Sequence, residues 1–273
     1  MKKIVQLTDI HVGIPECNTV MNNIVKNIKK RMTPASDYVI MITGDLVDEV
    51  DDALKNYKQA KQYIDDLKLA GFDVLVVPGN HDYGTGNRQL SYFVEKFKEV
   101  FYGDSSVSYP KKDIIGEIAF IGLDSMQGEM EKDTLSHDAK HSIFAAGSLG
   151  KRQLEELRVM LDTDPEVTGA EKIVVYMHHR PFYFSHLRSI LIPATGLFLQ
   201  DRKELKKIIK GKIDMLLFGH RHRSKAYYGK WKIPRIYDGG TSTKKANKSS
   251  PSPHMIIDLS SDQRNDIDGN FYE

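Results

Sequence analysis

Five segments of the sequence end an apolar run with residues that can bind metal ions or transfer protons. The run VLVV, residues 74–77, is followed by Gly79-Asn80-His81-Asp82. The other four segments carry Asp9-Ile10-His11, Gly44-Asp45, His178-His179 and Gly219-His220-Arg221-His222. Carboxylates, imidazoles and amides coordinate metals or carry protons, and they fill a hydrophobic core poorly. Their repeated position at the ends of apolar runs therefore indicates a shared chemical site.

The apolar runs are predicted β-strands. They cover residues 3–7, 38–42, 74–77, 118–123, 172–177 and 213–218. Several are apolar throughout, as expected of strands that are covered on both faces. Residues 51–69 and 148–161 have apolar positions three or four apart, which predicts helices, with Asp51 or Asp52 as the N-cap of the first. Strands alternating with helices predict an α/β fold with a largely parallel sheet.

The end of the sequence has a different texture. Short strand-like segments at 224–229, 235–240 and 254–259 are separated by Gly, Pro and Ser, which predicts antiparallel strands added to the α/β core. A chain of 273 residues can form one large domain. We expect a single domain over residues 1–273, with the polar residues 260–273 as a surface tail.

The composition is that of a soluble globular protein. The formal net charge of +2 favours no polyanionic partner, so a small-molecule substrate is preferred over nucleic acid. Cys17 is the one cysteine, which excludes an internal disulfide and fits a reducing compartment. No apolar run approaches the roughly 18 residues of a membrane-spanning helix, and polar residues interrupt the N-terminal run before it could form a signal peptide. We expect a cytoplasmic protein without membrane association, and the oligomeric state stays open.

The five segments should meet, because the carboxyl ends of parallel strands form the ligand-binding edge of an α/β sheet. They supply nitrogen and oxygen donors but no thiolate, which suits zinc, iron or manganese rather than an all-oxygen calcium or magnesium site. The seven candidate ligands are Asp9, His11, Asp45, Asn80, His178, His220 and His222. Seven ligands are too many for one tetrahedral ion with an open position. We therefore expect two ions that share a carboxylate, and Asp45 is the best bridge because it stands alone at its strand end.

Two such ions, roughly 3.5–4 Å apart, can generate a hydroxide near neutral pH and hold both the attacking and the leaving oxygen of a phosphoryl group. This chemistry hydrolyses a phosphate ester without a covalent enzyme intermediate. His81 follows Asn80 and exceeds the ligand count, so it could protonate the leaving alkoxide or stabilise the developing negative charge. Asp82 is the candidate residue for orienting His81.

The series DxH, GD, GNHD, HH and GHxH, in this order from Asp9 to His222, resembles the calcineurin-like metallophosphoesterases, especially their bacterial phosphodiesterase branch. The resemblance implies a four-layer α-β-β-α sandwich of two mixed sheets flanked by helices. It implies two divalent or trivalent transition-metal ions (Mn, Fe or Zn), with His81 as the catalytic histidine. By the same resemblance, one ion is held by Asp9, His11, Asp45 and His222, and the other by Asp45, Asn80, His178 and His220.

Two departures from related motifs bear on the substrate. Phosphoprotein phosphatases of this superfamily read GDxVDRG, whereas this chain reads GDLVDEV, so Glu49 stands at the position of their phosphate-binding Arg and would repel a phosphomonoester dianion. Arg180 stands in HHRPFY where many relatives have HHPP, and it could contact a phosphate or form an ion pair. We expect a phosphodiesterase that acts on a cyclic nucleotide or glycerophosphodiester by attack of a metal-bound hydroxide. The alternatives are a phosphomonoesterase, a nuclease or a catalytically silent binding scaffold.

Two further points stay open at the level of sequence. Neighbouring residues on an extended segment point in opposite directions, so either His178 or His179 faces the site, and the family pattern favours His178. The segment 124–147 is long for a connection in a compact domain and is a candidate for setting substrate choice. Its histidines His137 and His141 lie four residues apart, but the surrounding sequence lacks an apolar period and favours a loop.

Overall fold

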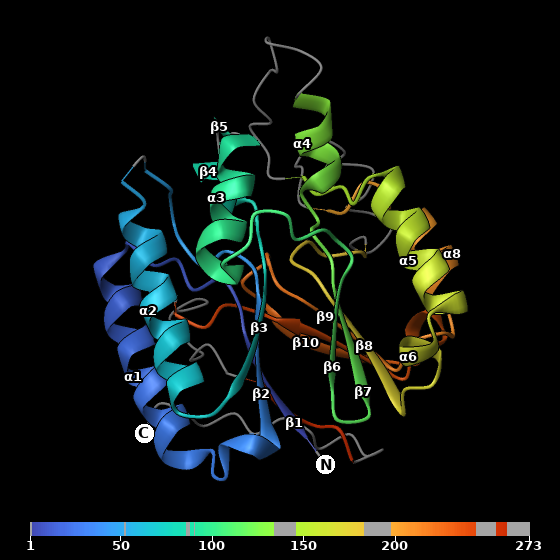
Figure 1. The fold of residues 1–273 in the computed structure, drawn as a ribbon, viewed down its shortest axis with the longest axis horizontal. Coiled ribbons are helices and arrows are strands. Elements are labelled where there is room, and N and C mark those ends of the chain that lie inside the picture. The colour runs from blue at the N-terminus through green and yellow to red at the C-terminus, as the bar shows by residue number, and fades with distance from the viewer. Residues whose placement is uncertain are drawn as a thin grey trace.

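Two sheets lie face to face at the centre of the structure, with helices on the outer side of each (Figure 1). The first sheet has the strand order β12-β1-β2-β3, and the second has the order β10-β11-β9-β8-β7-β6. The computed structural model describes residues 2–51, 53–85, 88–89, 91–133, 146–182, 198–243 and 255–260. Its order of layers is helix, sheet, sheet, helix. The predicted four-layer α/β sandwich of two mixed sheets is therefore confirmed.

The first sheet is mostly parallel. Its strands are β1 (Lys3–Leu7), β2 (Tyr38–Thr43), β3 (Asp73–Val77) and β12 (Met255–Asp258). β1, β2 and β3 run parallel in register, and β12 pairs antiparallel with β1. A separate two-stranded sheet pairs β4 (Gly84–Thr85) with β5 (Arg88–Gln89).

The second sheet has a parallel centre and antiparallel edges. Its strands are β6 (Lys111–Ile115), β7 (Ile118–Gly122), β8 (Lys172–Tyr176), β9 (Met215–Phe218), β10 (Ser224–Tyr228) and β11 (Arg235–Gly239). β7, β8, β9 and β11 are parallel, whereas β6 and β10 pair antiparallel at the two edges. The antiparallel pairings expected near the end of the chain are thus those of β10 with β11 and of β12 with β1.

The helices cover the outer faces of the two sheets. Beside the first sheet lie α1 (Pro15–Arg31), α2 (Lys55–Leu69) and α3 (Ser91–Tyr102). Beside the second sheet lie α5 (Lys151–Thr163), α6 (Pro165–Thr168) and α8 (Arg202–Ile209), and α4 (Gln127–Asp133) follows β7 (Figure 1). Short 3-10 turns occur at η1 (Ala35–Asp37), η2 (His81–Tyr83) and η3 (Lys230–Lys232). Among the helices described, none has the length and apolar character that a membrane-spanning segment needs.

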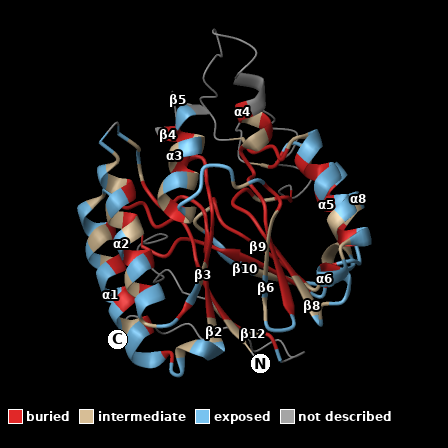
Figure 2. Cartoon of the chain, in the orientation of Figure 1, coloured by how far each residue is buried: buried red, intermediate tan, exposed pale blue. Residues whose placement is uncertain are grey.

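The apolar runs of the central strands serve two different cores. In β2, Val39 and Met41 point into the core between the sheets, whereas Ile40 and Ile42 point into the core under the helices. Side chains alternate along a strand, so a strand covered on both faces needs apolar residues at every position. Figure 2 shows the result, with buried central strands and helices whose outer faces are exposed.

The predicted helix over 51–69 begins later than expected. α2 starts at Lys55, and its N-cap is Leu54 in the left-handed region at φ 53°. Asp51 still satisfies the first turn, because the backbone N–H of Lys55 donates to its Oδ1 at 3.1 Å. Asp52, His137, His141 and the tail after residue 260 lie outside the described residues. Of the segment 124–147, the first part forms α4.

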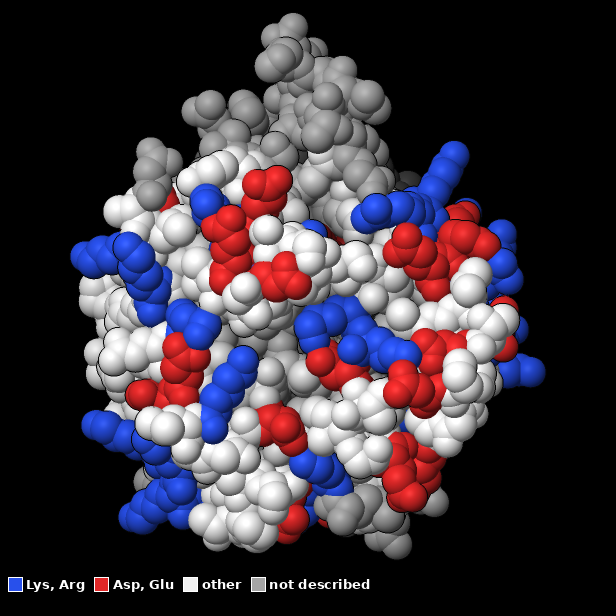
Figure 3. Space-filling view, viewed as in Figure 1, with Lys and Arg blue, Asp and Glu red and all other residues white. Residues whose placement is uncertain are grey.

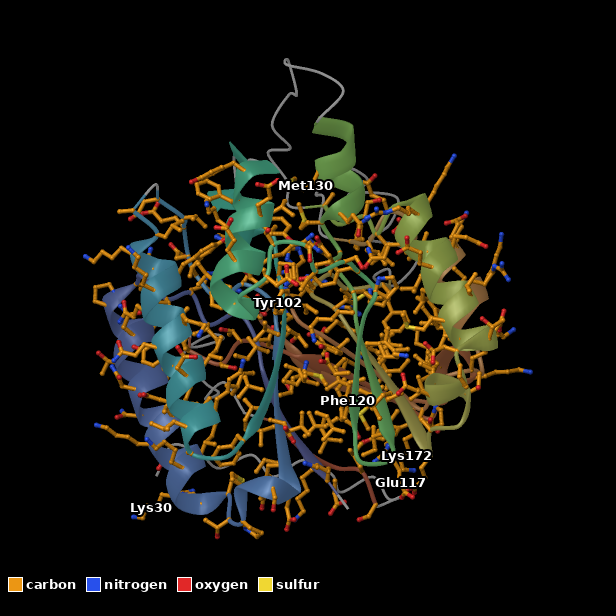
Figure 4. The ribbon with its side chains drawn as sticks, in the orientation of Figure 1. Lys30, Tyr102, Glu117, Phe120, Met130 and Lys172 are labelled. Carbon is orange, nitrogen blue, oxygen red and sulfur yellow. The ribbon has the colours of Figure 1, made fainter. Side chains whose placement is uncertain are left out.

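Substitution of Phe120 on β7 tests how tightly the core between the sheets is packed (Figure 4). The side chain is fully buried, so Phe120→Ala is expected to lower the free energy of unfolding by about 3–5 kcal/mol through lost burial and a residual cavity. Urea unfolding measures this change. Val159→Ala on α5 is the control, because Val159 is 44% exposed and its truncation should change the stability by about 0.5 kcal/mol or less. Equal effects of the two substitutions would contradict this packing.

Candidate metal centre

The five predicted segments converge where strands of both sheets end. β1 leads to Asp9 and His11, β2 to Asp45, β3 to Asn80, β8 to His178, and β9 to His220 and His222. The potential ligand atoms of Asp9, His11 and His222 lie within 4.8 Å of one another, and so do those of Asp9, Asp45 and His178. Two further groups at the same spacing are His178 with His179 and His220, and His11 with Asp45 and His81.

One half of the cluster is built around Asp9. Its Oδ1 lies 3.1 Å from His222 Nε2, and its Oδ2 accepts hydrogen bonds from the backbone N–H of His220 at 3.0 Å and from Thr8 Oγ1 at 2.6 Å. His11 Nε2 lies 3.3 Å from His222 Nε2. Asp9, which follows β1, thus contacts residues that follow β9, although β1 and β9 belong to different sheets.

The other half is built around Asp45. Its Oδ2 lies 3.2 Å from His178 Nε2, which in turn lies 3.1 Å from His220 Nδ1. The Nδ1–H of His178 donates to the carbonyl oxygen of Thr43 at 2.8 Å, which orients Nε2 toward the cluster. Asn80 is buried, and the backbone N–H of the next residue, His81, donates to Asp45 Oδ1 at 3.0 Å.

The two neighbouring histidines differ in their contacts. His178 Nε2 faces Asp45, whereas His179 Nδ1 lies 2.8 Å from Ser125 Oγ. The rings of His179 and His220 are nevertheless only 4.4 Å apart between centroids. The structure therefore brings both histidines to the cluster, and it places His178 next to the central carboxylate.

Left-handed backbone conformations are concentrated at the candidate ligands. Non-glycine residues with positive φ are Asp9, His11, Asp45, Leu54, His220, His222, Trp231 and Lys232 in the part of the chain that is described. Five of these eight are predicted ligands. A left-handed residue costs roughly 1–2 kcal/mol, and such strain gathers where a site requires one side-chain direction. Backbone hydrogen bonds hold it here, from Asp9 N to Gly44 O at 3.0 Å and from His11 N to Asp45 O at 3.1 Å.

Two glycines permit the loops to approach one another. A Cβ on Gly79 would lie 2.2 Å from Asp45 Oδ1, and a Cβ on Gly219 would lie 1.9 Å from Thr8 Oγ1. Any side chain at either position would displace the loop that carries a candidate ligand. The close approach of these neighbouring atoms therefore explains why glycines precede Asn80 and His220.

His81 is held at the edge of the cluster by Asp48. The Nδ1–H of His81 donates to the carbonyl oxygen of Asp48 at 2.6 Å, and the two rings of His11 and His81 are 4.9 Å apart between centroids. The carboxylate of Asp48 also lies 3.0 Å from His11 Nδ1. One residue thus positions both a candidate ligand and the candidate proton donor.

Asp82 has contacts other than those expected from the sequence. Its carboxylate accepts hydrogen bonds from the backbone N–H groups of Gly79 at 2.8 Å and Val47 at 3.1 Å. Burial and the nearby Asp45 raise the pKa of Asp82 to about 7. In the described structure Asp82 joins the loops after β2 and β3, and the ring of His81 is oriented by Asp48.

The charges at the centre are strongly coupled. Burial acts against the ionised form of Asp45, but His178 and His81 outweigh it and hold its pKa well below the usual range. Burial likewise opposes protonation of His178, yet Asp45 raises the pKa of His178 to about 9. A proton and a metal cation compete for the same ring nitrogen, so the raised pKa of His178 reports the negative charge that a cation would meet.

The chain matches the family model described as calcineurin-like phosphoesterase over residues 2–224. It belongs to this family. A comparison with curated proteins gives no significant match.

Solved structures of other proteins show the fold of this calcineurin-like phosphoesterase. A purple acid phosphatase from seeds of yellow lupin (Lupinus luteus) is similar with a TM-score of 0.54 and 13% identity, over 94% of this chain and 48% of that one. GAP50, the anchor in the inner membrane complex of Plasmodium, is similar with a TM-score of 0.52 and 16% identity, over 92% of this chain and 75% of that one. The chain thus spans about half the length of the lupin phosphatase.

The donor set of this calcineurin-like phosphoesterase fits metal ions, on which the family depends in pairs. Asn80 Oδ1 and His220 Nε2 are buried and have no hydrogen-bond partner among the described residues. Asp9 Oδ1 is likewise buried without a hydrogen-bond partner among the described residues, although it lies 3.1 Å from His222 Nε2. Buried polar atoms without partners are costly. Cations coordinated by these nitrogen and oxygen atoms would satisfy them.

Several residues that shape the site were missed in the sequence. Thr241 Oγ1 donates to the carbonyl oxygen of Asp9 at 2.9 Å, and Thr243 Oγ1 donates to that of Ile10 at 2.6 Å. The backbone N–H of Thr8 donates to Ser242 Oγ at 2.9 Å. These hydroxyls follow β11, whose end lies beside that of β9. The sequence signal that could have identified these hydroxyls is RIYDGGTST, in which polar residues follow the end of a sixth predicted strand.

Proposed function

We propose that this protein is a dinuclear metal-dependent phosphodiesterase. In this proposal Asp9, His11, Asp45 and His222 hold one ion, and Asp45, Asn80, His178 and His220 hold the other. The observation that carries the proposal is the position of Asp45, which lies beside His178 and also belongs to a group with His11 and His81. A carboxylate placed between two sets of donors can bridge two cations.

Two transition-metal ions at this position would supply Lewis-acid activation of a water molecule and neutralise charge on a phosphate ester. The protein's own contribution is to fix the donors before substrate arrives. Thr43 holds the ring of His178, Thr8 holds Asp9 Oδ2, and Asp48 holds the ring of His11. Such preorganised contacts spare reorganisation during the reaction.

His81 is proposed as the general acid. Its Nδ1–H is engaged by the carbonyl oxygen of Asp48, so Nε2 is the nitrogen that can deliver a proton to the leaving oxygen. His81 is half-buried, unlike the fully buried His178, and it lies next to His11. This location gives the ring access to a substrate beside the ions.

The preference for a diester is supported by Glu49, which is exposed and follows Asp48 in the loop after β2. A carboxylate near the site disfavours a dianionic monoester more than a monoanionic diester. Arg180 and Arg221 favour a second candidate function, a phosphomonoesterase, because guanidinium groups bind phosphate dianions well. A silent scaffold is a third candidate, since the same fold occurs in GAP50, an anchor. The full set of candidate ligands argues against it.

Activity on chromogenic esters tests these candidates. Protein freed of metal with a chelator should be inactive, and manganese, iron or zinc should restore hydrolysis of bis(p-nitrophenyl) phosphate. We expect kcat/KM for this diester to exceed that for p-nitrophenyl phosphate by about tenfold, a difference of about 1.4 kcal/mol in activation free energy. A reversed ratio would identify a monoesterase. Absence of turnover with all three metals would favour the scaffold.

A further inference from the structure

A group of cationic side chains borders the proposed metal centre. This cationic patch consists of Arg180, Arg221, Arg223, Lys225 and Lys230. Arg221 stands between the candidate ligands His220 and His222, and Arg180 follows His178 and His179. The loops that carry the ligands therefore also carry two guanidinium groups.

Tyr227 on the edge strand β10 organises the patch. Arg180 Nη2 donates to Tyr227 Oη at 2.7 Å. The ammonium nitrogens of Lys225 and Lys230 lie 5.2 and 5.0 Å from the centre of the Tyr227 ring. Lys230 Nζ also lies 3.8 Å from the centre of the Phe182 ring, which is buried beneath. Three cations thus share one aromatic surface.

The strand register places Lys225 of the patch and Tyr227 on one face of the second sheet. Lys225 pairs with Asp238, and Tyr227 pairs with Ile236, so these side chains lie on the same face. Ile236 packs in the core under α5 and α8, which identifies this face as the outer one. Asp238, near the end of β11, pairs with Phe218, the last residue of β9. The loop that carries Arg221 follows Phe218.

The positive charges of the patch act on one another. Arg180 and Arg223 act on Arg221 by repulsion, and Arg180 and Lys225 act in the same way on Lys230. Asp238 acts on both Arg180 and Arg221 by attraction. Like charges held together at the edge of a site are stabilised when an anion binds between them.

We propose that the cationic patch binds a second phosphate group of the substrate, next to the phosphoester that is cleaved. This inference rests on the proposed function and narrows its substrate class to small molecules that carry two phosphates. Two guanidinium groups suit a phosphate better than a carboxylate of lower charge, because each can present parallel N–H donors to the phosphate oxygens.

A small molecule fits the patch better than a long nucleic acid. The chain has 39 basic and 37 acidic residues, so its cations are nearly balanced over the whole protein. On the face shown in Figure 3, basic and acidic side chains alternate without an extended basic surface. Within this balance the patch gathers its cations from three short segments, at residues 180, 221–225 and 230.

A matched pair of chromogenic diesters tests the proposal. Thymidine 5′-(p-nitrophenyl phosphate) has one phosphate, and its 3′-phosphorylated counterpart differs only by the second phosphate. Both release p-nitrophenolate, so the ratio of their kcat/KM values isolates the second phosphate. We expect the manganese-loaded protein to prefer the 3′-phosphorylated compound by about 10- to 100-fold in low salt. The preference should decline as sodium chloride is added.

Substitutions locate the source of this preference. Arg221→Met and Lys230→Met should each lower the ratio by about fivefold or more through the loss of one charge–phosphate contact. Lys230 lies on η3, away from the ligand loops, so its substitution remains informative if Arg221→Met alters metal content. Arg152→Met on α5 is the control, because that side chain is 64% exposed and lies outside the patch. It should leave the ratio unchanged.

The outcomes separate this inference from the proposed function. A ratio near one, or equal loss of both rates in the variants, would overturn the second-phosphate site and assign the patch to the cleaved phosphate. If neither compound is hydrolysed, calorimetry with thymidine 3′,5′-bisphosphate and thymidine 5′-monophosphate still measures the preference in binding. Equal affinities would overturn the inference there too. An octathymidylate that competes better than the bisphosphate would instead identify nucleic acid as the source of the second phosphate.

Discussion

Replacing Asp45 with Asn is expected to reduce the metal content by at least one ion per chain and kcat/KM for bis(p-nitrophenyl) phosphate by about 10³-fold or more. A bridge between two cations needs a carboxylate, and loss of an ion removes several kcal/mol of charge stabilisation. The substitution leaves the local fold intact for a specific reason. Asn retains an Oδ1 that can accept the hydrogen bond from the backbone N–H of His81, which is 3.0 Å long in the wild type.

The Asp45→Asn variant is informative because its amide would face His178. The Asp45 Oδ2 that lies 3.2 Å from His178 Nε2 becomes an NH₂ group, which donates a hydrogen bond and cannot coordinate a cation. Metal analysis by mass spectrometry, together with steady-state kinetics, measures both effects. Asp65→Asn on α2 is the matched control, since that carboxylate is 52% exposed and pairs with Lys61. Full metal content with unchanged activity in Asp45→Asn would contradict the bridging role.

The central strands could be predicted from the sequence because they are buried on both faces. The unbroken apolar run 39–42 of β2 follows from the two cores that Met41 and Ile42 enter on opposite sides. The edge strand β6 was missed for the opposite physical reason. Its sequence KKDII is partly exposed, and Lys111 pairs with Asp113 on the strand itself. Such a strand is defined by its partner β7 rather than by its own composition.

The missed helix α1 carries its apolar residues among many polar ones. In α1, Met21, Ile24 and Ile28 are buried, and they are three or four residues apart, but Asn and Lys fill most of the positions between them. Cys17 is buried on the same face, as expected of a small hydrophobic side chain. Packing against the first sheet, rather than propensity alone, stabilises such a helix.

The candidate site was accessible from the sequence because its ligands follow strand ends, which topology brings to one edge. The contacts that position those ligands were not accessible. Asp48 reaches His11 from a different loop, and Ser125 reaches His179 from 54 positions away. Each contact joins residues that share no motif, so only the packed structure reveals it. The left-handed backbone at five candidate ligands likewise arises from the convergence of loops rather than from any single residue.

Replacing His81 with Ala is expected to lower kcat for an alkyl diester such as glycerophosphoethanolamine by about 10²–10⁴-fold, the usual contribution of a general acid. The effect on bis(p-nitrophenyl) phosphate should be far smaller, because p-nitrophenolate is a stable leaving group that needs little protonation. A residue that only supported the fold would lower both rates by the same factor. The comparison of leaving groups therefore distinguishes proton donation from structure.

The contacts of His81 make this difference measurable. Its side chain is half-buried and is held through the backbone carbonyl of Asp48, so truncation removes one ring and leaves the side chains of Asp48 and Asp45 in place. Metal content should stay at the wild-type value, because His81 is outside the seven proposed ligands. Asp48→Asn serves as the comparison, since it keeps the carbonyl that orients His81 and alters the carboxylate that lies 3.0 Å from His11 Nδ1. The Asp48→Asn variant should change the rates on both diesters by the same factor. A selective loss of the rate on the alkyl diester in Asp48→Asn, but not in His81→Ala, would assign proton donation to another group.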